Sequence, residues 1–508
     1  MRLDRGRIEE YSRRYRMALT QDEMAELEPL AQAALSKLER FDALHDDGGV
    51  PPGARDTPTP APTGADDPYN AVVRWCSVKS SSAGLLAGKR IGLKDNIALA
   101  GIPMTCGSRI LDGYRPDEDA VLVQRLLSQG AEIVAMLNMD SFAFSGSGET
   151  SDYGTILNPL DPTRTAGGSS GGSAAALYYD GIDITFGTDQ AGSVRIPASW
   201  CGVLGLKPTF GLVPYTGIFS QDPTFDHVGP LARTVSDLAL ALEAVAGPDD
   251  RVPTPGEKSV AGFLAAVDDA PARLDGVTIG LVREGMADDV GADAVTRAAV
   301  RDAVDRFAEL GARVEEISIP EHTWTRDGLG GALSFESCMA SLRAFGSGYH
   351  VFGRHAPDLA NALGRALETS AADLPPAVKL AVIVGAYSNE RYFGSLYAKA
   401  QNRRPSLRVA YDRALQSVDV LMMPTTPMPA YTREPDLSIA AQVRRGARMI
   451  DNTTPFNLTG HPSLSIPAAR VDALPLGVML TASHWSDARL LALARTYERA
   501  HGWYPEPR

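Results

Sequence analysis

The chain has 508 residues, of which 44% are hydrophobic and 22% charged, and this is ordinary globular composition. Its formal net charge is −13, and it contains no run of basic residues. This charge argues against nucleic acid or an anionic membrane surface as a partner.

The cysteines and histidines predict neither a disulfide framework nor a metal site. The four cysteines lie far apart with no CxxC pair, which argues against a zinc ribbon and favours a reducing compartment. The eight histidines form no HExxH motif or other close ligand pair. The charged N-terminus has no apolar segment of the secretory type, and no apolar stretch approaches about 20 residues. We therefore expect a cytoplasmic protein with no metal, no cofactor and no membrane contact.

The first 70 residues differ from the rest in composition and in hydrophobic pattern. Up to about residue 45 the chain reads as helix, with Leu30, Ala34, Leu38 and Phe41 at helical spacing. The stretch Asp46–Pro68 is rich in Pro, Gly, Asp and Thr and reads as a linker. We expect residues 1–70 to form a helical extension with a Pro-rich linker, used as a surface cap or as the contact of a homodimer.

Residues 71–508 have the alternating pattern of an α/β protein. Short strands are predicted at 90–95, 133–137, 277–282, 314–319 and 419–424, and residues 321–416 read as mostly helical. Twice a helix is followed by Gly-Ala and a strand. This order predicts a large mixed β-sheet core covered by helices on both faces. With no second linker in view, we expect one large domain.

A glycine-serine run, GGSSGG at 167–172, is the most unusual local feature. It lacks the lysine of a phosphate-binding loop, because Ser173 stands at that place, and it lacks the pattern GxGxxG. It matches GxSxG twice, but the preceding residues hold two prolines and predict no strand, unlike a nucleophile elbow. A plain turn into the helix that follows is the remaining local interpretation.

Two further segments change this interpretation. Residues 185–214 read TFGTDQAGSVRIPASWCGVLGLKPTFGLVP, and Lys94 stands in RIGLKDN upstream. Together with DVLMMPTTP and NTTPFNLTGHPSLSIP near the C-terminus, these motifs resemble the amidase signature family over residues 70–500. The long motif is nearly complete and highly specific.

The resemblance implies a Ser–cisSer–Lys triad. Ser193 corresponds to the nucleophile, Ser169 to the bridging serine after a cis peptide bond with Gly168, and Lys94 to the base. The chemistry requires a neutral lysine, so the pKa of Lys94 has to fall by about three units, which burial in a strand can supply.

The same resemblance implies an oxyanion hole made by the backbone amides of Gln190, Ala191, Gly192 and Ser193. Ala191 departs from the family, which has glycine there, so this turn must be accessible to an L-residue. We expect Asp189 and Arg195 to fix the loop through buried polar contacts. Ser170 is expected to hold the glycine-serine loop and Ser173 to cap or pack the next helix.

For the substrate, the chain resembles broad-specificity bacterial amidases with a helical N-terminal extension. This implies hydrolysis of small aliphatic or aromatic carboxamides, with anilides, hydrazides or esters as variants. Phe144 and Ile450 are candidate pocket residues, and core packing is the alternative for each. The glutaminase subunit of a tRNA-dependent amidotransferase, which works with partner subunits, is the alternative function. A non-catalytic protein on the same fold is a further one.

Overall fold

The computed structural model describes residues 3–44, 59–60, 67–249, 252, 261–287, 292–346, 353–434 and 436–503. The chain divides into two compact units, Met1–Val50 and Pro51–Arg508. Most of the predicted linker Asp46–Pro68 lies outside the described residues. No helix in the described ranges is long and apolar enough to cross a bilayer.

The first unit contains the two helices α1 (Arg5–Arg14) and α2 (Gln21–Asp42), as the sequence predicts. Thr20 and Glu23 form a capping box that satisfies free amides at the start of α2. The predicted apolar stripe on α2 is not buried: Leu30, Leu38 and Phe41 are 66%, 56% and 72% exposed.

The second unit is built on a mixed, 12-stranded sheet with the order β1-β2-β4-β3-β7-β9-β8-β13-β14-β12-β10-β11. The strands are β1 (Thr59–Pro60), β2 (Val72–Lys79), β3 (Arg90–Lys94), β4 (Glu132–Leu137), β7 (Ile184–Asp189), β8 (Leu204–Lys207), β9 (His227–Ala232), β10 (Thr278–Val282), β11 (Arg313–Ile317), β12 (Val420–Pro424), β13 (Ser463–Val471) and β14 (Leu474–Thr481). β3 pairs in parallel with both β4 and β7, whereas β9 pairs antiparallel with β7. The carboxyl ends of β3 and β7 therefore meet at one edge.

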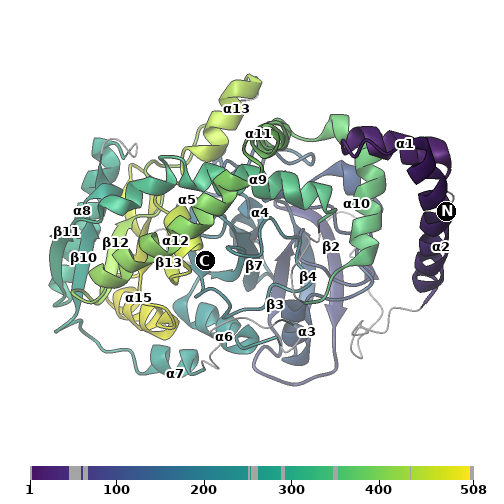
Figure 1. Ribbon diagram of the computed structural model, residues 1–508. Helices are drawn as coiled ribbons and strands as arrows, with labels where there is room; N and C mark the ends of the chain where they lie inside the picture. The colour runs from purple at the N-terminus through teal and green to yellow at the C-terminus, as the bar shows by residue number, and fades with distance from the viewer. Residues whose placement is uncertain are drawn as a thin grey trace. The chain divides into compact units, whose positions relative to one another are not determined.

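Helices surround this sheet (Figure 1). They are α3 (Val121–Ser128), α4 (Gly171–Ala175), α5 (Arg195–Cys201), α6 (Val235–Val245), α7 (Phe263–Asp268), α8 (Ala294–Glu309), α9 (Leu329–Arg343), α10 (Pro357–Ser370), α11 (Pro376–Tyr392), α12 (Ser395–Ala414), α13 (Ile439–Ala447), α14 (Thr454–Thr459) and α15 (Asp487–His501). Short 3-10 helices are η1 (Arg109–Leu111), η2 (Ser141–Ala143), η3 (Ala176–Tyr178), η4 (Glu284–Met286), η6 (Pro320–Thr325) and η7 (Ala371–Asp373).

Both faces of the sheet are covered, as predicted. Successive residues of a strand point to opposite faces. On β9, Leu231 belongs to the apolar cluster that contains residues of α4 and α5, whereas Ala232 belongs to the cluster that contains residues of α6 and α15. The sequence prediction of an α/β fold with helices on both faces of a mixed sheet is confirmed.

The segment before the glycine-serine run differs from the prediction. The residues that were expected to hold no strand form a small hairpin of β5 (Leu157–Asn158) and β6 (Asp161–Thr165). The prediction rested on the two prolines, but an edge strand tolerates proline. This hairpin forms a separate two-stranded sheet, so it does not supply the buried strand of a nucleophile elbow.

Candidate active site

Lys94 ends strand β3 and is completely buried. Its Nζ donates to Ser169 Oγ at 2.7 Å and to Thr188 Oγ1 at 2.9 Å. Burial lowers the pKa of the Lys94 ammonium to about 7, against the opposing charges of Asp140 and Asp189. The neighbouring Asp95 points elsewhere, since its carboxylate accepts from the Thr105 amide at 3.0 Å. The lysine is therefore poised to exchange a proton near neutral pH.

Ser169 lies in the loop between β6 and α4. The Gly168–Ser169 peptide bond is cis, as expected. The Gly168 amide donates to the Gly146 carbonyl at 2.8 Å, and a Cβ at Gly168 would overlap the Asp140 carboxylate. Glycine is thus required at 168 because the carboxylate approaches the backbone closely.

The other serines of the run support this loop. Ser170 Oγ donates to the Thr188 carbonyl at 3.1 Å, which ties the loop to β7 as expected. Ser173 Oγ donates to the Phe186 carbonyl at 3.2 Å, so it packs the start of α4 against the same strand.

Ser193 lies in the loop that joins β7 to α5 and is 5% exposed. Its carbonyl accepts from the Ser170 amide at 3.2 Å, which places it beside the loop that carries Ser169. The structure therefore gathers all three predicted triad residues at the carboxyl ends of β3 and β7.

A buried ion pair fixes the loop that carries Ser193. Arg195 Nε and Nη2 each donate to the Asp189 carboxylate, at 3.0 and 2.9 Å. The same carboxylate accepts from the amides of Gly192 at 2.7 Å and Val194 at 3.1 Å. Burial by itself would raise the pKa of Asp189, but the charge and hydrogen bonds of Arg195 hold it well below its ordinary value. Both residues have the loop-fixing contacts that the sequence predicts.

The backbone amide of Gly192, predicted to belong to the oxyanion hole, has another partner in the structure. Because this amide donates to Asp189, it is not available to an oxyanion in this conformation. The amides of Gln190, Ala191 and Ser193 donate to no acceptor within the described part of the chain, so they are the candidate donors. The carboxylate competes for Gly192 because the whole turn wraps around it, which motif position alone does not reveal.

The departure at Ala191 is accommodated by the backbone. Ala191 is not among the residues with positive φ, whereas Gly192 has φ of 131°. A Cβ at Gly192 would overlap Thr453 Oγ1 and lie 2.7 Å from Thr453 Cβ. The conformation that needs glycine is therefore confined to 192, and an L-residue fits at 191.

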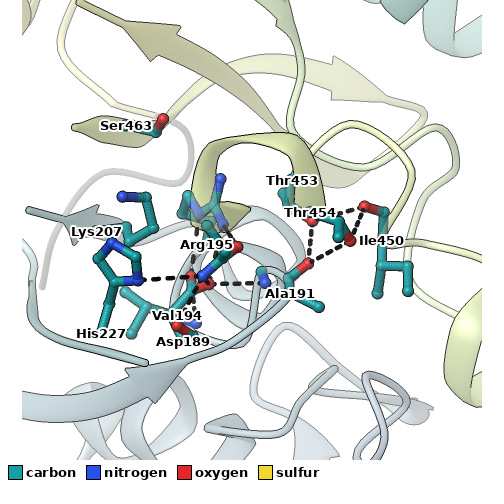
Figure 2. Close-up of polar contacts among 12 residues, drawn as sticks. Asp189, Ala191, Val194, Arg195, Lys207, His227, Ile450, Thr453, Thr454 and Ser463 are labelled. Atoms are coloured by element: carbon teal, nitrogen blue, oxygen red, sulfur yellow. Dashed lines mark hydrogen bonds and ion pairs between the residues drawn. The ribbon is translucent and has the colours of Figure 1, made fainter. Parts of the chain in front are cut away.

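The C-terminal motif buttresses the loop from the other side (Figure 2). Thr453 Oγ1 donates to the Ala191 carbonyl at 2.5 Å, and Thr454 Oγ1 lies 3.4 Å from the same oxygen. Asn457 Nδ2 donates to the Asp189 carbonyl at 2.7 Å. Short helix α14 thus holds the turn in place.

The two predicted pocket residues, Phe144 and Ile450, pack against different apolar clusters. The Ile450 carbonyl accepts from the Thr453 amide at 3.1 Å and the Thr454 amide at 2.9 Å, so its backbone positions the helix that contacts Ala191. Its side chain is partly buried against the cluster of Ile196 and Trp200. Phe144 is partly buried against the main core. The packing alternative accounts for both side chains, and their contact with a substrate stays a prediction.

Sequence reasoning missed the residues that support Lys94. Thr188 Oγ1 accepts from Lys94 and also from Asn96 Nδ2 at 3.1 Å. Asp140 accepts from the amides of Gly148 and Thr150, each at 2.9 Å, and presents its charge to Lys94. Thr188 and Asn96 stand inside the quoted motifs beside Asp189 and Lys94, which was the available signal. Asp140 had no such signal because only the fold brings it to the site.

The chain matches a known family over most of its length. The sequence pattern of the family described as Amidase matches residues 76–491. The chain belongs to the amidase family. It is 35% identical over 432 residues to a glutamyl-tRNA(Gln) amidotransferase subunit from Methanococcoides burtonii, covering 83% of this chain and 86% of that one.

Solved structures agree with the family. The corresponding glutamyl-tRNA(Gln) amidotransferase subunit from Thermotoga maritima superposes with a TM-score of 0.68 at 27% identity, covering 87% of this amidase and 90% of that chain. The 6-aminohexanoate cyclic dimer hydrolase superposes with a TM-score of 0.72 at 26% identity, covering 84% and 88%. This amidase is therefore an enzyme acting on amide C–N bonds.

Proposed function

We propose that this amidase hydrolyses a carboxamide through an acyl-enzyme on Ser193. The observation that carries the proposal is the contact between Lys94 Nζ and Ser169 Oγ at 2.7 Å, in surroundings that lower the pKa of the lysine to about 7. A neutral lysine accepts a proton from a serine hydroxyl, and a serine without such a base is a weak nucleophile.

The proposed steps begin with attack of Ser193 Oγ on the amide carbonyl carbon. The Ser193 proton passes to Ser169 while the Ser169 proton passes to Lys94. The carbonyl oxygen, now an anion, accepts from the amides of Gln190, Ala191 and Ser193. Each such donor contributes about 3 to 4 kcal/mol to transition-state stabilisation.

Collapse of the tetrahedral intermediate breaks the C–N bond, and Ser169 protonates the leaving nitrogen while Lys94 returns its proton to Ser169. Water then attacks the ester carbonyl, passing one proton through Ser169 to Lys94. The ester C–O bond breaks, Ser193 regains its proton, and the carboxylic acid leaves. Every proton moves among groups of this chain, the substrate and the attacking water.

For the acyl group, the curated relatives favour glutamine over small amides. Those relatives, 35% identical over most of the chain, carry the name of an amidotransferase that acts on glutamyl-tRNA(Gln). We therefore propose the side-chain carboxamide of glutamine as the first substrate, with the chain acting beside partner subunits.

A free-standing hydrolase of small aliphatic or aromatic carboxamides, or of anilides, hydrazides or esters, is the second candidate. Phe142 and Phe219 form an aromatic pair 5.5 Å apart. The Phe219 amide donates to the Asn96 carbonyl at 2.9 Å, and Asn96 contacts Thr188, so this apolar pair lies near Lys94. Both rings are buried in the core, and an aromatic acyl group bound beside Lys94 would pack against them.

Release of ammonia or amine from glutamine, benzamide, acetanilide and benzhydrazide by the purified chain distinguishes the two. Selective turnover of glutamine supports the amidotransferase-type assignment. Turnover of benzamide or acetanilide at least tenfold above that of glutamine supports the second candidate. If Ser193→Ala releases ammonia or amine as fast as wild type does from a compound that wild type turns over, the proposed acyl-enzyme is wrong.

Assembly and location stay predictions. The exposed stripe of Leu30, Leu38 and Phe41 on α2 supports a homodimer formed through the N-terminal helices. Light scattering of wild type and of Phe41→Glu tests it, since the charged variant is expected to be monomeric. The four free, buried cysteines are compatible with the cytoplasm.

A further inference from the structure

Three side chains from separate segments converge at the end of α14, and none of them belongs to the candidate active site described above. Asp412 belongs to α12. His461 lies in the segment between α14 and β13, and His484 lies in the segment between β14 and α15. His461 is completely buried, and the other two are partly buried. One ligand atom from each lies within 4.8 Å of the other two.

Hydrogen bonds to Thr459 fix which ring nitrogens carry hydrogen. His484 Nε2 lies 2.9 Å from the Thr459 carbonyl, which can only accept, so Nε2 is the donor. The Thr459 hydroxyl donates its single hydrogen to the Pro455 carbonyl at 3.0 Å. It therefore accepts from His461 Nδ1 at 2.9 Å.

A metal-bound imidazole is neutral, and in that form the opposite nitrogen of each ring presents a lone pair to the same carboxylate oxygen. His461 Nε2 lies 3.0 Å from Asp412 Oδ1, and His484 Nδ1 lies 3.7 Å from the same atom. Three electron-rich atoms facing one another repel unless a cation lies between them.

We propose that Asp412, His461 and His484 bind a divalent transition-metal ion of the zinc class. Two imidazoles and a carboxylate are ligands that zinc accepts, and tetrahedral ligands at about 2.0 Å from zinc lie about 3.3 Å apart. The two distances to Asp412 Oδ1 bracket that separation. Thr459 orients both rings through their other nitrogens, as partners of metal-bound histidines do.

The neighbouring Arg408 leaves Asp412 Oδ1 available to a metal ion. Arg408 Nε lies 3.5 Å from Asp412 Oδ2, so it occupies the other oxygen of the carboxylate. The Arg408 cation lowers the affinity of this place for a metal, and the anionic Asp412 offsets that effect.

The ion would connect α12, the end of α14 and the turn before α15. Because α14 carries Thr454 and Asn457, which hold the loop of Ser193, the proposed role is structural support of that loop. The ligands are too far apart in the chain to form a spacing motif, which is why the sequence predicts no metal.

The test uses the untagged full chain, stripped with a chelator, desalted and incubated with ZnCl2. After a second desalting, elemental analysis is expected to find one zinc per chain, and the Tm is expected to rise by about 2 to 4 °C. Cobalt(II) in place of zinc is expected to give visible ligand-field bands at the same stoichiometry.

His484→Gln and Asp412→Asn are each expected to weaken zinc binding at least tenfold and to remove the Tm shift. His501→Gln, which removes an exposed imidazole at the end of α15, serves as the matched control and is expected to bind zinc as wild type does. Wild type without retained zinc, or equal retention by His484→Gln, would overturn the proposal. Neither zinc retention nor the Tm depends on amide hydrolysis, so the test of the metal site is independent of the test of the proposed function.

Discussion

Lys94→Met is expected to stabilise the protein at neutral pH while removing its activity. The substitution replaces a buried amine by an apolar chain of similar length. In the folded protein burial lowers the pKa of Lys94 from 10.5 to about 7. At about 1.4 kcal/mol per pKa unit, keeping this amine neutral costs about 5 kcal/mol at pH 7.

Three hydrogen bonds offset part of that cost. Lys94 Nζ contacts Ser169 Oγ, Thr188 Oγ1 and the Thr188 carbonyl, at 2.7, 2.9 and 3.3 Å. At about 1 kcal/mol each, their loss leaves Lys94→Met about 2 kcal/mol more stable than wild type at pH 7.

The pH dependence gives the sharper test. Between pH 7 and 10.5 the unfolded lysine is protonated and the folded one is not, so the unfolded state binds more protons and stability rises with pH. From pH 7 to pH 10 wild type gains about 4 kcal/mol from this group. At pH 10 the variant is therefore expected to be about 2 kcal/mol less stable than wild type.

Urea unfolding of both proteins at pH 7 and pH 10 measures the difference. Burial also lowers the pKa of Lys207, but this group is present in both proteins and cancels. Turnover by the variant should fall by about 10²- to 10⁴-fold, the usual contribution of a general base. A variant that is less stable than wild type at pH 7, by an amount that does not change with pH, would refute a neutral Lys94.

Three further predictions concern the same site. The kcat/KM of wild type is expected to fall as pH drops through about 7, because Lys94 becomes protonated; a flat profile from pH 5 to 8 would contradict this. Gly192→Ala is expected to lower kcat about 10²-fold or more through displaced amides, whereas Ala191→Gly should stay within about threefold in the same assay. Arg195→Met leaves Asp189 buried without its cation and should lower the free energy of unfolding by about 3 to 5 kcal/mol, measured in urea; a loss below about 1 kcal/mol would speak against the ion pair.

Much of the fold could be predicted because its local signals agree with one another. The stretch ending at Lys94 reads as a strand and is one, and the helix-Gly-Ala-strand phrases form α3-β4 and α8-β11. The hairpin β5-β6 was missed because its prolines outweighed its weak pairing signal. Strand order could not be predicted either, since pairing between distant strands leaves no local pattern.

The candidate site also contains some contacts that the sequence predicts and others that depend on the fold. Residues that contact one another within one turn, such as Asp189 and Arg195, stand in the same motif, so the sequence predicts their contact. They do not reveal that Asp189 also takes the Gly192 amide, which depends on how the turn closes. Asp140 and its effect on Lys94 depend on the packing of separate segments, so only the structure locates them.

The most direct test of the central claim is the site of covalent labelling by a fluorophosphonate probe. Intact-mass and peptide analysis of the labelled protein should show one adduct, carried by Ser193. Ser193→Ala should take no label, and Ser169→Ala should be labelled far more slowly because the proton path to Lys94 is interrupted. An adduct on Ser169, or unchanged labelling of Ser193→Ala, would contradict Ser193 as the nucleophile.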